Sequence, residues 1–188
     1  QPPWAAMEEL GVPVGFHPTG HSSLRDDLAR RYLDTPNGRV IGVAGRNPVE
    51  LMMAFGSLAA GGVLERHPSL RCAFLEGTCG YLPWWLWRLD EAWEKFGPGS
   101  EVQISQLPSQ YFFRQCYIAT DADEKPLRQV IEAIGDDSIV VSTDYPHSDG
   151  LFPTAIEEFT HLEGVSDKSK TKILWDNCAR LYNLGAGA

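Results

Sequence analysis

The stretch SIVVSTDYPHSD, from Ser138 to Asp149, contains a predicted strand followed directly by an acid, a proline and a histidine. It begins with a short β-branched run, which is typical of a buried strand. Asp144 follows where that strand ends, and Pro146 and His147 come shortly after it. An aspartate in this position can stabilise a turn through its own backbone. It can also stand on the catalytic rim of a parallel sheet, where the loops after the strands carry the chemistry.

Three further segments have the character of this strand, and helical segments separate them. The predicted strands are Val12–His17, Leu70–Gly77, Gln115–Asp121 and SIVVSTD. The predicted helices are Asn47–Arg66, Tyr81–Gly97, Asp123–Gly135, Pro153–Leu162 and Asp167–Tyr182. Repeated alternation of strands and helices predicts an α/β fold with parallel strands, and long polar loops after the strands favour a TIM-type (β/α) barrel. An open doubly wound sheet is the alternative, although no GxGxxG or P-loop motif follows any strand.

The first long helix has an unusual composition. The segment NPVE predicts its start, with Asn47 as the N-cap, Pro48 at the first helical position and Glu50 placed to reach back. From there to Arg66 the helix is apolar almost all round. Such a helix is buried in a core or lies in a subunit interface.

A polar residue stands at or just after the end of each predicted strand: His17, Glu76, Asp121 and Asp144. In a parallel sheet these ends meet at one edge, where an imidazole and carboxylates can hold a divalent metal. Each residue also has a structural interpretation. His17 precedes a proline in a turn, and Glu76 can solvate a loop. Asp121 is interpreted as a helix-capping or loop acid and is left outside the predicted site.

The other histidines and the tryptophans are given mainly structural roles. His67 and His161 lie late in predicted helices, where a basic group complements the helix dipole. His21, in the long first loop, can face the site. A tryptophan cluster is interpreted as core or interface packing in preference to the lining of a pocket; its members are Trp84, Trp85, Trp87 and Trp93.

The composition excludes several classes of partner. The 188 residues include 16 basic and 25 acidic ones, for a net charge of −9, and basic residues form no run of nucleic-acid-binding type. No apolar stretch approaches the roughly 20 residues that span a bilayer. We therefore expect neither nucleic acid nor a membrane as a partner. The cysteines form no CxxC pair and are expected to be buried free thiols, which indicates a reducing, cytoplasmic compartment; they are Cys72, Cys79, Cys116 and Cys178.

Several motifs together resemble one known family. They are GFHP, NPVELMMAFGSLAAGGVLERHPSLRCAFLEG, YLPWWLWRLD, IVVSTDYPHSD and KILWDNCARLYNL, spread over nearly the whole chain from about Val12. The family is that of the amidohydrolase-related metal-dependent hydrolases (amidohydrolase family 2), which includes aminocarboxymuconate semialdehyde decarboxylase. The resemblance implies a TIM-type barrel with one divalent metal, usually zinc. A full barrel needs about 250 residues and eight strands. Because the chain lacks the family's first-strand HxH motif, residues 1–188 are interpreted as the C-terminal half, strands five to eight.

The resemblance also implies roles for particular residues. His17 matches a metal-binding histidine after the fifth strand, and Asp144 matches an aspartate after the eighth strand that binds metal or transfers protons. Glu76 stands where many members have a histidine, and it is the third predicted ligand. Asp144 is expected to act as general base on a metal-activated water, and His147 to orient the substrate or donate a proton. The expected function is that of a metal-dependent hydrolase or decarboxylase acting on a small carboxylated or aromatic molecule.

A half-barrel also has a non-catalytic interpretation, as an incomplete module that assembles with another chain. It would leave two open sheet edges and one exposed apolar face. We expect a homo-oligomer, or pairing with an N-terminal half, through an interface that buries more than about 1,000 Å². We also expect the chain alone to bind zinc weakly and to be inactive, because a catalytic zinc usually keeps about three protein ligands.

Overall fold

The computed structural model of the protein describes residues 3–18, 35–148 and 150–185. Four strands form one parallel sheet in the order β1-β2-β3-β4: β1 (Val14–Phe16), β2 (Cys72–Phe74), β3 (Cys116–Asp121) and β4 (Ile139–Ser142). The helices are α1 (Trp4–Leu10), α2 (Gly38–Ala60), α3 (Val63–Arg66), α4 (Leu82–Phe96), α5 (Pro108–Gln115), α6 (Leu127–Ile134), α7 (Ala155–His161), α8 (Asp167–Thr171) and α9 (Asn177–Tyr182). A 3₁₀ turn covers Gly97–Gly99, and a π-helical turn, Lys172–Asp176, joins α8 to α9.

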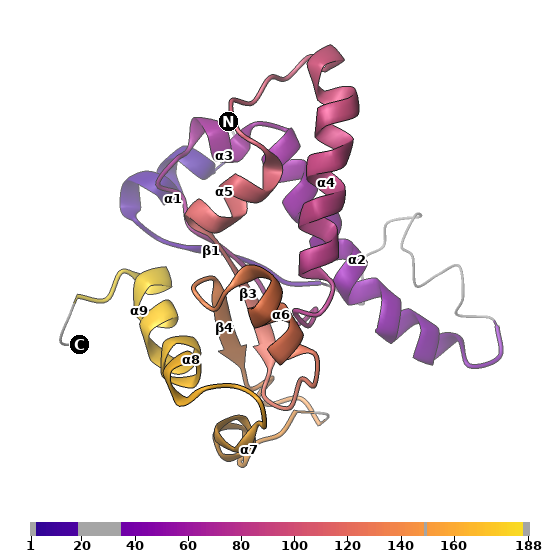
Figure 1. Ribbon diagram of the computed structural model, residues 1–188, viewed down its shortest axis with the longest axis vertical. Coiled ribbons are helices and arrows are strands. Elements are labelled where there is room, and N and C mark those ends of the chain that lie inside the picture. The colour runs from indigo at the N-terminus through magenta and orange to yellow at the C-terminus, as the bar shows by residue number, and fades with distance from the viewer. Residues whose placement is uncertain (1–2, 19–34, 149, 186–188) are drawn as a thin grey trace.

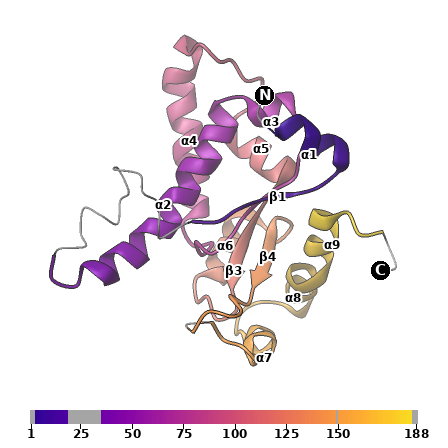
Figure 2. The same cartoon turned by 180° about the vertical axis from the view of Figure 1, so that it is seen from behind.

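The parallel α/β arrangement confirms the predicted alternation of strands and helices. Figures 1 and 2 show the strands side by side, with α8 and α9 beside β4 and with the first part of α2 extending away from the rest of the molecule. Asn177, at the start of α9, holds the last strand in place, because its amide donates to the carbonyls of Asp136 and Ile139 at 2.7 and 2.6 Å. The buried amide thus satisfies backbone groups next to an edge of the described sheet.

The start of α2 differs from the prediction. The helix begins at Gly38, so Asn47 is not an N-cap and Pro48 lies inside the helix. A proline within a helix removes one backbone hydrogen bond, here the one to the carbonyl of residue 44. The helix ends at Ala60 with Gly61 as its C-cap, and Gly62, with φ at 71°, precedes α3. Glycine adopts this left-handed conformation without the penalty that a side chain brings.

Other helix boundaries also differ. Helix α6 begins at Leu127 and not at Asp123, because the carbonyls of Asp121 and Glu124 accept hydrogen bonds in turns that precede the helix. The short helices α1 and α5 were not predicted. The continuous helical segment from Asp167 to Tyr182 agrees with the prediction, although its middle turn is π-helical.

The main core lies on one face of the sheet. Alternate strand residues point to opposite faces, and those on this face pack against helices α2, α4, α5 and α6. Its largest buried side chains are aromatic: Phe55, Phe74, Tyr111, Phe112 and Phe159. The rings of Phe55 and Phe74 meet edge to face with centroids 5.7 Å apart, an arrangement that aromatic quadrupoles favour.

The opposite face of the sheet is also covered. Ala73, Ala119 and Val140, which alternate with residues of the main core, are buried against Leu181 of α9. The expectation of an exposed apolar face is therefore wrong at these positions, because α9 packs there.

The prediction of buried free thiols is confirmed for Cys72, Cys79 and Cys116, whereas Cys178 is free but only half-buried. Of the helices in the described part of the chain, none has the length and apolar character needed to cross a membrane.

Candidate functional site

The strands are parallel, so their carboxyl ends share one edge of the sheet, and polar side chains gather there. An open cavity of about 570 Å³ lies at this edge. Loops after the strands and helix α2 line it with His17, Pro18, Ala44, Arg46, Asn47, Pro48, Glu76, Gly77, Thr78, Asp121, Asp144 and His147. The predicted placement of His17, Glu76 and Asp144 at one end of the sheet is confirmed. Their role as metal ligands stays a prediction.

The site contains two pairs of an imidazole and a carboxylate. His17 Nε2 lies 2.7 Å from Glu76 Oε2, and His147 Nδ1 lies 2.8 Å from Asp144 Oδ1. The carboxylates are the better buried members, with side chains 25% and 26% exposed against 50% and 57% for the imidazoles. An imidazole binds metal when it is neutral, and a carboxylate binds metal when it is ionised. Each pair therefore contains two groups that can bind metal.

The same residues fit a divalent cation. One ligand atom each of Glu76, Asp144 and His147 lies within 4.8 Å of the others. Two carboxylates with an imidazole are a donor set that suits zinc or manganese. His17 lies next to this group through its contact with Glu76. The predicted ligands thus lie together, and His147, predicted as a catalytic residue, is also placed to bind metal.

Both candidate carboxylate ligands have an unusual backbone conformation. Glu76 has φ at 58° and Asp144 at 53°, and Thr78 follows with φ at 58°. Residues with side chains rarely adopt this left-handed region, and each instance costs about 1 kcal/mol or more. Backbone strain of this kind concentrates at functional sites, because the surrounding structure must hold it in place. The local sequence alone gives no signal of it.

Hydrogen bonds from side chains and from the backbone fix these strained segments. The Asn47 amide of α2 donates to the Glu76 carbonyl at 3.0 Å, so the predicted N-cap residue instead ties the helix to the loop after β2. The Asp144 N–H donates to Ser142 Oγ at 3.3 Å, and the His147 N–H donates to the Asp144 carbonyl at 2.9 Å. Contacts with α2 therefore hold the backbone of Glu76, and contacts with β4 and its following loop hold that of Asp144.

A buried acid that the sequence prediction missed connects two of the loops. Glu124 is 8% exposed and accepts hydrogen bonds from the backbone N–H groups of Cys79 and Gly80 at 2.9 Å. The hydroxyl of Thr120 donates to it at 2.9 Å. Hydrogen bonds to an ionised acceptor are about twice as strong as neutral ones. Burial, and then the nearby Glu124 carboxylate, raises the pKa of the Cys79 thiol.

Asp121 was left outside the predicted site, but it lines the cavity together with the predicted residues. Burial, and then the nearby carboxylates of Glu124, Asp123, Asp144 and Glu76, raise its pKa to about 6. An acid with a raised pKa among other acids is common at active sites. Its position at the end of β3 was the signal in the sequence that could have placed it in the site. With Asp121 included, the site contains an acid at or just after the end of each of β2, β3 and β4.

The histidines and tryptophans with structural interpretations lie away from the cavity. His67 Nδ1 lies 2.8 Å from Glu8 Oε2, and His161 Nδ1 lies 2.8 Å from the Glu157 carbonyl. No tryptophan occurs among the described residues that line the cavity. Trp85 donates to the Met52 carbonyl at 3.0 Å, which supports packing. His21 lies outside the described residues.

Comparison with solved structures identifies the fold. An amidohydrolase of Mycobacterium avium subsp. paratuberculosis K-10 is 25% identical, with a TM-score of 0.78 over 98% of this chain and 45% of that chain. A dihydroxybenzoic acid decarboxylase of Polaromonas sp. JS666, solved with bound manganese and the inhibitor 2-nitroresorcinol, is 26% identical, with a TM-score of 0.69 over 97% of this chain and 53% of that chain. These relatives are TIM barrels, and the chain matches about half of each. The predicted fold, part of a TIM-type barrel, is therefore confirmed.

A search of curated proteins also finds a decarboxylase. The 2-amino-3-carboxymuconate-6-semialdehyde decarboxylase of Dictyostelium discoideum is 24% identical over 184 residues, which is 97% of this chain and 48% of that protein. The chain therefore spans about half the length of the relative that it matches. The model of one family, described as amidohydrolase, matches residues 1–184. Since this match covers nearly the whole chain, the protein belongs to the amidohydrolase family.

Proposed function

We propose that the protein is a metal-dependent decarboxylase that acts on a small aromatic or otherwise carboxylated molecule, with hydrolysis by the same site as the second possibility. The observation that carries the proposal is the group formed by Glu76, Asp144 and His147, whose ligand atoms lie within 4.8 Å of one another at the carboxyl end of the sheet. Relatives that include decarboxylases, one of them solved with manganese, support it.

In this proposal, Glu76 and Asp144 hold the divalent cation together with His17, which contacts Glu76, and His147 serves as the proton donor. We propose zinc as the cation. Imidazole and carboxylate donors suit zinc, and the same donors accept manganese, the ion in the Polaromonas relative. When bound, the cation supplies Lewis acidity, which stabilises negative charge on substrate oxygens. Metal analysis of the purified protein distinguishes the two ions.

The chain's own residues provide for proton transfer. Because Asp144 Oδ1 lies 2.8 Å from His147 Nδ1, the carboxylate fixes the Nδ1–H tautomer and stabilises a protonated ring. In decarboxylation, the bond between the ring carbon and the carboxylate breaks, carbon dioxide leaves, and the electron pair stays on that carbon. The protonated His147 then delivers a proton to the carbon. In hydrolysis, Asp144 acts as a general base towards water.

Activity can be tested directly. The natural full-length protein, loaded with zinc or manganese, is incubated with dihydroxybenzoates, and release of carbon dioxide is followed. We expect metal-dependent release that a chelator abolishes and that the added metal restores. Absence of turnover on a broad panel of aromatic carboxylates, with the metal bound, would contradict the decarboxylase proposal and leave hydrolysis to be tested with esters and amides.

We further propose that residues 1–188 form the C-terminal half of the barrel and that the active site is completed by an HxH-bearing half. The chain's span of about half its relative's length supports this. The 188-residue chain alone is then expected to bind zinc weakly and to turn over nothing, and the chain joined to an HxH-bearing half to be active. Stoichiometric, tight zinc in the chain alone would contradict this.

Exposed apolar residues support the second candidate function, an assembly module. The projecting part of α2 exposes Val40 and Ile41. Met53, later in α2, and Trp84 and Trp87, on α4, are each more than half exposed. Side chains of this kind on a protein surface favour contact with a partner. We propose a homo-oligomer, or pairing with an N-terminal half, in the cytoplasm. A monodisperse monomer of the natural full-length protein in light scattering at micromolar concentration would count against the homo-oligomer.

A further inference from the structure

The cavity contains a guanidinium that neither the proposed metal site nor the proton transfer uses. Arg46, on α2, lines the cavity together with Glu76, Asp121 and Asp144. The ion pairs found between described residues do not include Arg46. An arginine beside several carboxylates usually forms an ion pair with one of them. Here Glu76 pairs with His17 and Asp144 pairs with His147 instead.

Arg46 is nevertheless held in a defined position. Its Nε–H donates to Asn47 Oδ1 at 3.0 Å, and the Asn47 amide donates to the Glu76 carbonyl at 3.0 Å. The side chain is half-buried, so its orientation is restricted by its surroundings. Because Asn47 binds the Nε edge, the two terminal nitrogens form the fork that pairs with a carboxylate through two parallel hydrogen bonds.

The charges of the cavity give this fork a function. Glu76, Asp121 and Asp144 make the lining negative, which opposes entry of an anionic substrate. A bound divalent cation would attract the reacting carboxylate. A second anionic group on the substrate would then lie among the carboxylates of the cavity. Among the described residues that line the cavity, Arg46 is the one lysine or arginine that can bind such a group.

We propose that Arg46 binds a second, non-reacting carboxylate of the substrate and thereby selects aromatic molecules with two separated carboxylates over those with one. This inference rests on the proposed function for the first carboxylate, but its own observations concern α2. Arg46 is thus a specificity-determining residue, and Asn47 is the residue that positions it.

The test compares two probes that differ by one carboxylate, benzoate and benzene-1,3-dicarboxylate. Their binding to the metal-loaded full-length protein is measured by calorimetry, for wild type, Arg46→Gln, Arg46→Lys and the control Arg128→Gln. Arg128 is matched in charge but lies on α6, in an exposed ion pair with Glu132 at 2.8 Å. Metal content and thermal unfolding are measured for every variant.

We expect wild type to prefer the dicarboxylate, and Arg46→Gln to weaken dicarboxylate binding by at least about tenfold while benzoate binding changes by less than about twofold. Arg46→Lys should recover part of the loss, because it restores the charge without the fork. Arg128→Gln should change neither affinity. Equal losses for both probes, no loss at all, or a wild type without preference for the dicarboxylate would overturn the inference.

The outcomes also separate this inference from the proposed function. A protein that binds no metal but loses its preference for the dicarboxylate in Arg46→Gln would overturn the metal-dependent function and support the role of Arg46. A protein that binds metal and releases carbon dioxide, with unchanged probe binding in Arg46→Gln, would support the function and overturn the role of Arg46.

Discussion

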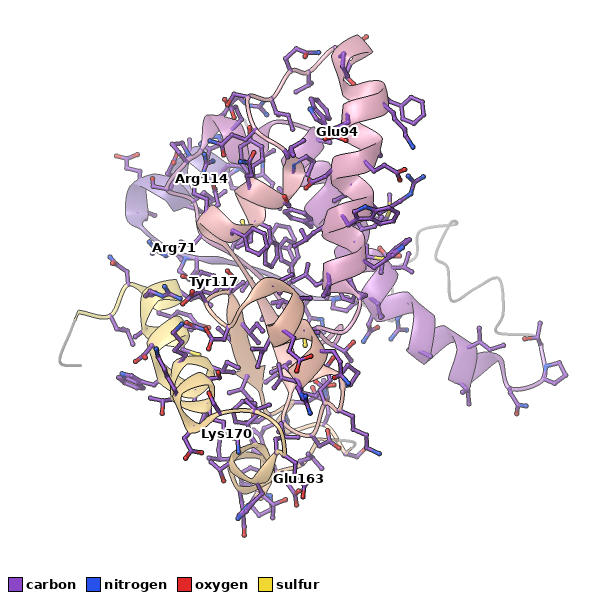
Figure 3. All side chains as sticks on the ribbon, in the orientation of Figure 1. Arg71, Glu94, Arg114, Tyr117, Glu163 and Lys170 are labelled. Carbon is purple, nitrogen blue, oxygen red and sulfur yellow. The ribbon has the colours of Figure 1, made fainter. Side chains whose placement is uncertain are left out.

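The two ends of the sheet both carry charged residues, but they arrange them in opposite ways. At the amino end, Arg71 donates to the carbonyls of Leu181 and Gly11, and Figure 3 shows it close to Tyr117. His67 there pairs with Glu8. Each of these basic groups thus meets an acid or a carbonyl from another element.

At the carboxyl end, acids gather instead. Glu76, Asp121 and Asp144 line one cavity, and two of them have left-handed backbones. Like charges and strained backbone both cost stability. The amino end thus uses charge to hold the chain together, whereas the carboxyl end bears a stability cost that a bound cation would offset.

The largest effect on stability is expected at the buried acid of the carboxyl end. Glu124→Gln should lower the free energy of unfolding by roughly 3 kcal/mol, because backbone N–H groups that now donate to a carboxylate would face an amide. Urea denaturation measures the change. The control Glu132→Gln removes an exposed acid with one ion pair on α6 and should cost less than about 0.5 kcal/mol. Equal losses in the two variants would show that Glu124 does not hold the loops.

A catalytic effect of similar size is expected from Asp144→Asn. Turnover of the metal-loaded full-length protein should fall by at least about 10²-fold, since the side chain loses its basicity and its hold on the protonated His147. Stability should not fall, because one acid of the cluster is removed. Steady-state kinetics and thermal unfolding check both statements. A variant with full activity would mean that the site is misassigned.

At the amino end the expected effect is on stability alone. Arg71→Met should lower the free energy of unfolding by about 2 kcal/mol, because the carbonyls of Gly11 and Leu181 lose a charged donor. Metal affinity, measured by calorimetry, should stay within about twofold of wild type, since the residue lies at the end of the sheet away from the cavity. A loss of metal affinity that matches the loss of stability would break the proposed division between the two ends.

The smallest effect is a dependence of stability on pH. In the metal-free protein, the pKa of Asp121 is raised from its ordinary value of 3.8 to about 6, mainly by burial. The folded state therefore binds this proton more tightly than the unfolded state, and its contribution to stability is full below about pH 4 and is lost as the pH rises through about 6. With an allowance for partial exposure, the loss is roughly 1 kcal/mol. Asp121→Asn should flatten the curve between pH 4 and 6, and an unchanged curve would argue against the shift.

The sequence was sufficient to predict the frame of the site. The β-branched run before Asp144 and the alternation with helices placed His17, Glu76 and Asp144 at one end of a parallel sheet, as the structure has them. This worked because strand direction follows from the crossover helices, and the end of each strand is marked by a polar residue.

Features that depend on tertiary contacts were not predictable. Pro48 is typical of a first helical turn, and nothing local showed that α2 begins at Gly38. Asp121 has the sequence context of a loop acid, and its membership in the site depends on burial beside acids of other loops. The role of Glu124 depends on backbone groups of a loop about 45 residues away, whose position the local sequence does not reveal.

The central claim, that the carboxyl-end cluster is a divalent-metal site, is tested most directly by calorimetric titration of the metal-free full-length protein with zinc. Wild type is compared with Glu76→Gln/Asp144→Asn, which keeps the side-chain shapes but removes both carboxylates. We predict one ion per chain in wild type and an affinity at least about 100-fold lower in the double variant, since even changes beyond the ligands themselves cost about 10–100-fold. Equal affinities in the two proteins, or no binding by wild type, would contradict the account.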